Sequence, residues 1–143
     1  MTLVTDVNVV LKWFSSVNEE DVTAARHLYQ QLQLGKIEVY APSSLLIEVA
    51  NIFLHKKHFS EKEVKESLER IQNSGIHFVD FSAENMDKLI ELCDHHQLTT
   101  HDGLYLLLAQ EKKSYLITTD EQLLKVKRTC LSLKEWVNSS LAG

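Results

Sequence analysis

The sequence predicts an α/β domain built around a central, mainly parallel β-sheet. Short runs of apolar and β-branched residues recur along the chain, and longer segments with helical periodicity separate them. With 143 residues, 44% of them hydrophobic, the chain can bury a substantial core without a disulfide framework or a structural metal. No stretch is rich in Pro, Gly or Ser, so we expect residues 1–143 to form a single domain.

The elements follow from these patterns in order. Charged residues alternate with an apolar stripe over residues 20–34, and Gly35 then ends this amphipathic helix. Ser60 and Glu63 have the spacing of a capping box, which predicts a helix start at residue 61. Strands are expected at residues 3–5, 38–41, 76–79, 115–118 and 129–131, and helices at 20–34, 44–55, 61–72, 82–95, 100–112 and 120–125.

Composition excludes several classes of protein. The formal charge is −5, whereas domains that hold nucleic acid by charge alone are usually basic, so any chemistry on nucleic acid would need cations. No apolar run approaches the roughly 18 residues of a membrane span, and the first 14 residues lack signal-peptide features, so we expect a cytoplasmic protein with no membrane partner. Cys93 and Cys130 have no CxxC spacing and are expected to be reduced, buried thiols.

Two aspartates closely follow predicted strands. Asp6 comes after the strand at 3–5, and Asp120 comes after the strand at 115–118. The carboxyl ends of parallel strands meet at one edge of a sheet, where ligand crevices form. Asp6 and Asp120 would therefore face the same crevice if their strands are neighbours.

Two further acids stand on predicted helices. Glu48 lies at the margin of the apolar stripe of the helix at 44–55, so its carboxylate would look towards a cleft. Asp102 lies near the start of a helix that is apolar nearly all round, where unpaired backbone N–H groups and the helix dipole favour an anion. An almost wholly apolar helix is expected at the centre of the domain.

Each acid also has an ordinary structural interpretation. Asp6 and Asp120 can be helix N-caps, Asp102 can form a capping box with Thr99, and Glu48 can pair with a lysine. Together the four acids favour another interpretation, because carboxylates gathered in one crevice raise one another's pKa and need cations at neutral pH. Hard oxygen ligands of this kind suit Mg²⁺ or Mn²⁺.

Four motifs carry a resemblance that spans essentially the whole chain. VTDVNVVLKW (residues 4–13), APSSLLIEVAN (41–51), HDGLYLLLA (101–109) and LITTDEQL (116–123) resemble, in this order and spacing, the motifs of PIN-domain ribonucleases, most closely the VapC-type toxins. The resemblance implies a three-layer α/β/α fold, Mg²⁺- or Mn²⁺-dependent endoribonuclease activity on RNA, homodimerisation, and control by a cognate antitoxin protein in a type II toxin–antitoxin pair. The chain departs from the pattern at Gly103, where the family commonly has Ala, and at His101.

The resemblance also implies roles for individual residues. The family's four acids fall on Asp6, Glu48, Asp102 and Asp120, with Asp6 and Asp102 as the principal metal ligands. Its two small polar residues fall on Asn8 and Thr118, which would orient water or phosphate. Lys12, on the first motif, and His101, at the mouth of the site, are candidate substrate-binding residues. Among the aromatic residues, Trp13, Phe14, Phe53 and Phe59 can stack on bases, seat an antitoxin, or pack in the core or a dimer interface.

Three alternatives remain open at the level of sequence. One is a PIN nuclease without an antitoxin, and another is a non-catalytic PIN module that binds RNA or protein. The neighbouring His101 and Asp102 also resemble the metal motif of HD phosphohydrolases. That family has an all-helical scaffold, which the predicted strands argue against.

Overall fold

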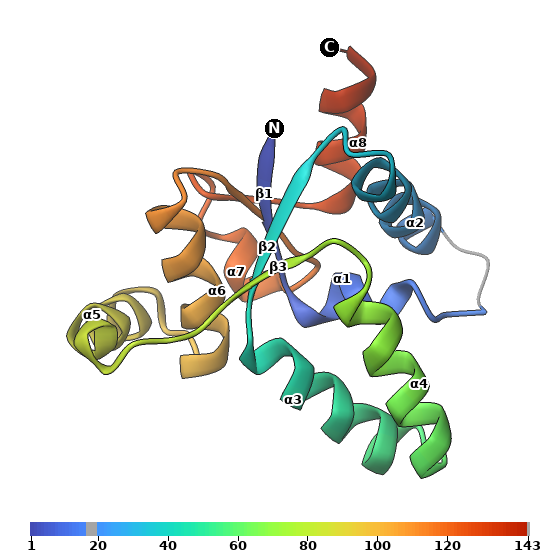
Figure 1. Cartoon of the computed structure of the whole chain (residues 1–143). Helices are drawn as coiled ribbons and strands as arrows, with labels where there is room; N and C mark the ends of the chain where they lie inside the picture. The colour runs from blue at the N-terminus through green and yellow to red at the C-terminus, as the bar shows by residue number, and fades with distance from the viewer. Residues whose placement is uncertain (17–19, 143) are drawn as a thin grey trace.

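The computed structural model describes residues 1–16 and 20–142. Within these residues, parallel strands form a five-stranded sheet in the order β3-β2-β1-β4-β5 (Figure 1). The strands are β1 (Thr2–Thr5), β2 (Glu38–Pro42), β3 (His77–Val79), β4 (Tyr115–Ile117) and β5 (Cys130–Leu131). The predicted parallel sheet is confirmed, and every predicted strand is present with boundaries shifted by a residue or two.

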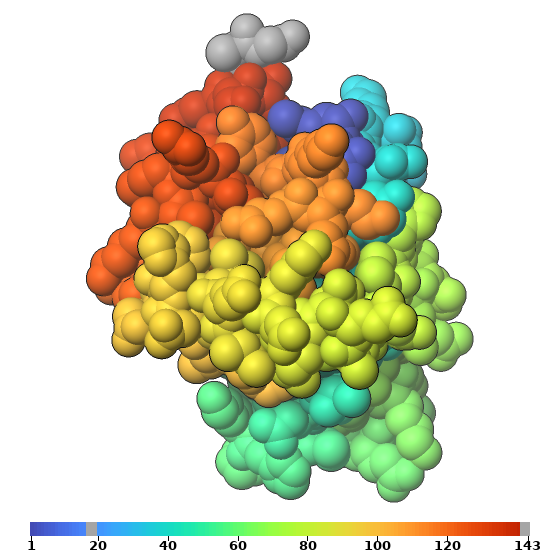
Figure 2. Space-filling view, turned by 90° about the vertical axis from the view of Figure 1, so that its left-hand side faces the viewer, coloured from blue at the N-terminus to red at the C-terminus, as the bar shows by residue number. Residues whose placement is uncertain are grey.

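Helices cover both faces of the sheet, which makes the fold a three-layer α/β/α sandwich. In Figure 1, α5 and α6 lie on one side and α2 and α8 on the other, while α3 and α4 extend beyond one edge. Figure 2 shows α5 lying across α6 on the outside of its layer. The helices are α1 (Val7–Lys12), α2 (Glu20–Gln33), α3 (Ser44–Asn51), η1 (Ile52–Lys56), α4 (Glu61–Gln72), η2 (Ala83–Asn85), α5 (Met86–His96), α6 (Thr100–Glu111), α7 (Glu121–Leu124) and α8 (Leu133–Ala142).

The strand register brings two chain segments together at the carboxyl edge of the sheet. In the β1–β4 pair, Thr5 stands opposite Ile117, so both strands end at the same level. The next residues, Asp6 and Thr118, therefore leave the sheet side by side. Helix α6 runs back against the strands and contacts β1, β2 and β4, so its first turn also lies at this edge.

Helix α6 lies at the centre of its layer, as its composition predicts. Gly103 and the segment from Tyr105 to Ala109 are buried, and Tyr105 is only 1% exposed. A helix with apolar side chains on all faces is stable only where both sheet and neighbouring helix cover it. Here the sheet covers one side of α6, and α5 covers the other.

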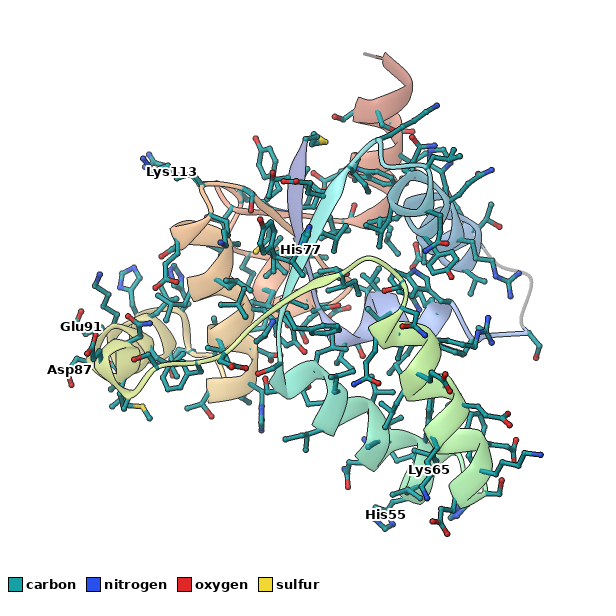
Figure 3. All side chains as sticks on the ribbon, in the orientation of Figure 1. His55, Lys65, His77, Asp87, Glu91 and Lys113 are labelled. Carbon is teal, nitrogen blue, oxygen red and sulfur yellow. The ribbon has the colours of Figure 1, made fainter. Side chains whose placement is uncertain are left out.

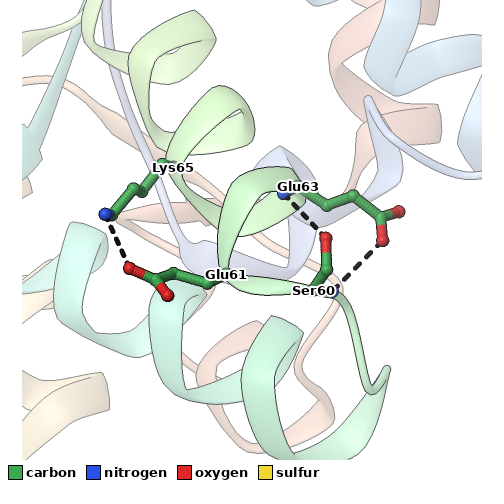
Figure 4. A network of polar contacts seen from close by, with 4 residues as sticks. All are labelled: Ser60, Glu61, Glu63 and Lys65. Carbon is green, nitrogen blue, oxygen red and sulfur yellow. Dashed lines mark hydrogen bonds and ion pairs between the residues drawn. The ribbon is translucent and has the colours of Figure 1, made fainter.

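The capping box predicted for α4 is present. The Glu63 backbone N–H donates to Ser60 Oγ at 3.1 Å, and the Ser60 backbone N–H donates to Glu63 Oε1 at 3.1 Å (Figure 4). Lys65 forms an exposed ion pair with Glu61 at 2.7 Å one turn along the helix. The box determines where α4 begins, directly after Phe59.

The sequence did not predict α1 and α8. Val7–Lys12 is rich in β-branched residues, which favour strands, but burial of Val7, Val9 and Val10 and the Asp6 cap stabilise a helix instead. The helix expected at 44–55 changes to π-helical hydrogen bonding at Ile52, and the one expected from residue 82 starts as the 3₁₀ turn η2. These differences are local and leave the predicted architecture intact.

The two cysteines are as the sequence predicts. Cys93 and Cys130 are free and buried. None of the helices described is both long and apolar enough to cross a membrane.

Candidate active site

Asp6 lies at the carboxyl edge of the sheet, between β1 and α1. Its side chain is 2% exposed and caps α1, since the Val9 backbone N–H donates to Asp6 Oδ1 at 3.2 Å. The Thr118 hydroxyl donates to the other carboxylate oxygen, Oδ2. Both oxygens of this buried carboxylate therefore accept a hydrogen bond, one from the segment that follows β1 and one from the segment that follows β4.

Thr118 connects Asp6 to Asp120. Thr118 is fully buried, and its Oγ1 accepts a hydrogen bond from the Asp120 backbone N–H at 3.0 Å. Asp120 in turn caps α7, accepting from the Leu123 backbone N–H at 2.9 Å. The N-cap interpretation of Asp6 and Asp120 is thus correct, and so is their predicted position at the same edge of the sheet.

Glu48 reaches this region from α3. The Tyr105 hydroxyl donates to Glu48 Oε1 at 3.0 Å, and His101 Nδ1 lies 3.7 Å from the same oxygen. The Glu48 side chain is 19% exposed, as expected at the margin of a buried face, whereas the His101 side chain is 67% exposed. Two residues of α6 therefore contact the same oxygen of the Glu48 carboxylate.

Asp102 stands in the first turn of α6, half-buried. Thr99 caps this helix, since its Oγ1 accepts from the Asp102 backbone N–H at 3.2 Å. The cap fixes the orientation of the helix start, which points towards the edge of the sheet where Asp6 lies. Of the capping box expected from the sequence, the structure gives the half in which the Thr99 side chain caps the helix.

The acids affect one another's protonation. Burial raises the pKa of Asp6 from 3.8 to about 7, against the opposing hydrogen bonds from Thr118 and Val9, and repulsion from Asp102 and Asp120 adds to the rise. Burial and then repulsion from Asp120 raise the pKa of Asp102. The aspartates thus behave as one electrostatic cluster.

Glu48 belongs to the same cluster. Burial raises its pKa, the hydrogen bond from Tyr105 and the nearby His101 oppose the rise, and the Asp102 carboxylate adds to it. Burial and the neighbouring carboxylate also raise the pKa of Tyr105, so the phenol keeps its proton and remains a donor to Glu48. Glu48 is thus linked to the aspartates through Asp102.

A divalent cation suits the chemistry of this donor set. Carboxylate oxygens are the ligands that Mg²⁺ and Mn²⁺ prefer, and a cation would remove the repulsion that raises these pKa values. In the part of the chain that the structure describes, no three Asp, Glu, His or Cys side chains are grouped closely enough to hold one ion. The site therefore fits a divalent cation in the type of its donor atoms and in its negative charge.

The other predicted residues lie around the acids. Asn8 and Lys12, on α1, line a cavity that also includes Thr119. His101 covers Glu48, as described above. His55 projects from the end of η1, away from the sheet (Figure 3).

Sequence reasoning missed the role of Tyr105. The sequence indicated Tyr105 only as one residue of an apolar helix, whereas in the structure its hydroxyl donates to Glu48. A signal was available, because Tyr105 stands three residues after Asp102 and so lies on the same face of α6. The hydroxyl of a buried tyrosine usually has a hydrogen-bond partner.

The fold and this acidic edge define a known class of domain. The model of the PIN domain family matches residues 3–129, so the chain belongs to the PIN-domain family. PIN domains are generally nucleases and typically depend on divalent metal ions. The parallel sheet also excludes the all-helical HD phosphohydrolases.

Two solved structures have similar folds. The crystal structure of PAE2754 from Pyrobaculum aerophilum matches with a TM-score of 0.68 and 15% identity, covering 100% of both chains. VapBC2 from Rickettsia felis, bound to a DNA fragment from its promoter, matches with a TM-score of 0.62 and 18% identity over 92% of this chain and 98% of that chain. Among curated proteins, no relative in sequence was found.

Proposed function

We propose that this protein is a Mg²⁺- or Mn²⁺-dependent endoribonuclease that hydrolyses RNA phosphodiester bonds. The observation that carries the proposal is the Asp6 carboxylate, buried at the edge of the sheet with a pKa raised to about 7 beside Asp102 and Asp120. Capping explains Asp6 and Asp120 one at a time, but it gives no reason to gather them with Asp102, because burying repelling carboxylates lowers stability. A bound cation gives that reason.

Asp6 and Asp102 would be the principal ligands of the cation, and Glu48 and Asp120 would complete its environment. The cation, when bound, supplies positive charge at the phosphoryl oxygens and activates water for attack. The chain's own residues orient these ligands. Thr118 holds Asp6 Oδ2, and its Oγ1 also binds the backbone of Asp120.

Other residues act on the metal ligands and the substrate. Tyr105 and His101, both on α6, contact Oε1 of the Glu48 carboxylate and so restrict its orientation. Asn8, exposed in the first turn of α1, would orient water or phosphate, while Lys12 and His101 would contact RNA.

We further infer that the nuclease is the toxin of a type II toxin–antitoxin pair. The support is the motif resemblance to VapC-type toxins, together with the fold shared with VapBC2 from Rickettsia felis. On this proposal the chain is a single PIN domain, forms a homodimer, acts in the cytoplasm and is inhibited by a cognate antitoxin. Growth arrest on expression, relieved by a small co-purifying partner, is the expected behaviour. Growth unaffected by the active enzyme would indicate a PIN nuclease without an antitoxin.

The first experiment is cleavage of a mixed RNA pool by the purified protein in Mg²⁺ or Mn²⁺, with an EDTA control. Asp6→Asn and Asp102→Asn keep side-chain size and should abolish cleavage, whereas Asp80→Asn, on the exposed segment after β3, should retain it. Discrete fragments that depend on metal and vanish in both site variants would support the proposal. Absence of cleavage by wild-type protein with metal bound would instead indicate a binding module.

A further inference from the structure

A cavity of about 520 Å³ opens beside the acidic cluster. Its walls come from α1 and the turn after it, from the start of α2, and from η1 with the loop that follows. This volume lies within the range of roughly 300–1,000 Å³ that is usual for small-molecule sites. The proposed metal ligands do not line it, so it is a separate feature of the surface.

The cavity is continuous with the acidic cluster along the chain. Asn8, on its rim, is two residues from Asp6, and Thr119, also on its rim, stands between Thr118 and Asp120. A strand of RNA whose phosphate lies at the carboxylates would therefore have its neighbouring nucleotide within reach of the cavity.

One wall of the cavity is aromatic. Phe14 and Phe53 meet edge to face with ring centroids 5.5 Å apart, and Phe53 and Phe59 lie 4.7 Å apart at 31°. Phe53 is buried, whereas Phe14 and Phe59 are partly exposed. The Arg70 guanidinium packs over Phe14 at 5.1 Å. Nucleobases stack on exposed aromatic side chains of this kind regardless of their identity.

The backbone that carries Phe53 and Phe59 in this wall is irregular. At η1 the helix changes to π-type bonding, with the Lys57 N–H donating to the Ile52 carbonyl at 2.9 Å. His58 then adopts a left-handed conformation at φ 54°, and the Phe59 N–H returns to the Phe53 carbonyl at 2.8 Å. π-Helical turns are rare and occur frequently at functional sites. This one turns Phe59 back onto Phe53 and brings Lys57 to the cavity.

The charge of the cavity is opposite to that of the acidic cluster. Lys12 and Lys57 line it, and no acidic side chain among the described residues does. A protein of net charge −5 must present cations locally to hold a polyanion. A lining that combines phenylalanine rings with two lysines matches a nucleotide, which has a flat base and a phosphate, better than it matches an apolar peptide helix.

We propose that this cavity binds the nucleotide of single-stranded RNA that flanks the cleaved phosphodiester. The base stacks on Phe14 and Phe59, and Lys12 and Lys57 contact the phosphates. The proposal rests on the nuclease function proposed above and adds a nucleotide subsite, together with the residues that form it.

The test measures binding of a fluorescein-labelled single-stranded RNA by anisotropy in EDTA, and cleavage of the same RNA in Mg²⁺. Phe59→Leu keeps an apolar side chain but removes the ring, and should weaken binding about tenfold. Phe59→Tyr keeps the ring and should bind within about twofold of wild type. Thermal unfolding checks that both variants fold.

Lys57 gives an independent test with a matched control. Lys57→Ala should weaken binding about fivefold and lower the slope of log K against log salt by about one, because one phosphate contact is lost. Lys56→Ala removes another exposed lysine, one that does not line the cavity, and should leave both quantities unchanged. Lys57 is exposed, so its substitution does not depend on core packing.

The outcomes separate this proposal from the nuclease proposal. If wild type cleaves RNA while Phe59→Leu and Lys57→Ala bind and cleave as it does, the cavity is not on the RNA path and belongs to a protein partner. If the variants lose binding but wild type never cleaves, the cavity binds RNA and the nuclease proposal fails. Wild type that does not bind RNA overturns the cavity proposal.

Discussion

Replacing Asp6 with Asn should stabilise the metal-free protein at neutral pH. Asp6 is 2% exposed, and its pKa is raised from 3.8 to about 7, mainly by burial. Between these two values the folded chain keeps a proton on Asp6 that the unfolded chain has released. The free energy of unfolding therefore falls as the pH rises through this interval, and the loss is complete above pH 7.

The magnitude follows from the same two values. The gap between 3.8 and about 7 corresponds to at most about 4 kcal/mol, since each pKa unit is worth about 1.4 kcal/mol. Asparagine carries no charge but still accepts from Val9 through Oδ1, and its amide faces the Thr118 oxygen in place of a carboxylate. Each rearranged hydrogen bond costs about 1 kcal/mol, so a net gain of about 1–3 kcal/mol is expected. In a domain of this size that raises Tm by about 3–10 °C.

Thermal and urea unfolding in EDTA between pH 5 and pH 8 measure the effect. The advantage of Asp6→Asn over wild type should be small at pH 5, grow with pH and level off above pH 7. Asp80→Asn, at an exposed position, should track wild type throughout. An Asp6→Asn protein that is less stable than wild type at pH 8, or whose advantage does not change with pH, would refute the reasoning.

Three further outcomes are expected. Mg²⁺ at a hundredfold excess over its Kd should stabilise wild type by about 2.7 kcal/mol in thermal shift assays, and Asp6→Asn should lose this response; an equal response would argue against Asp6 as a ligand. A Cβ at Gly103 would overlap Cys93 Sγ, so Gly103→Ala should cost about 1–3 kcal/mol in urea unfolding, and adding Cys93→Ala should recover most of it. Tyr105→Phe removes the donor to Glu48, and should lower stability by about 1 kcal/mol and slow RNA cleavage; unchanged cleavage would leave Tyr105 a purely structural role.

The Gly103 prediction also explains a departure from the family pattern. The family commonly has Ala at this position, and the sequence alone offers no reason for glycine. In the structure, α5 lies so close to α6 that the Cys93 side chain occupies the space of a Cβ. This steric dependence between position 103 and position 93, which lie on different helices, can be recognised only when the packing of the two helices is known.

Local chemistry made much of the fold predictable. The Ser60–Glu63 capping box and the short apolar strand runs depend on residues close in sequence, and both were found where expected. The predicted edge shared by Asp6 and Asp120 followed from one general property of parallel sheets. Helix α1 was missed because its valines favour a strand locally, and burial against the core decides otherwise.

The sequence by itself determined the fold class, the family and which four acids deserve mutation, because these depend on periodicity and on ordered motifs. Only the tertiary structure decided how the acids are held. The Thr118 hydroxyl on Asp6 and the Tyr105 hydroxyl on Glu48 join residues 112 and 57 positions apart. Likewise, the π-helical turn that brings Phe59 onto Phe53 depends on packing against α4 and Phe14. Contacts of this kind have no local signature, since they arise from the register of strands and the packing of helices.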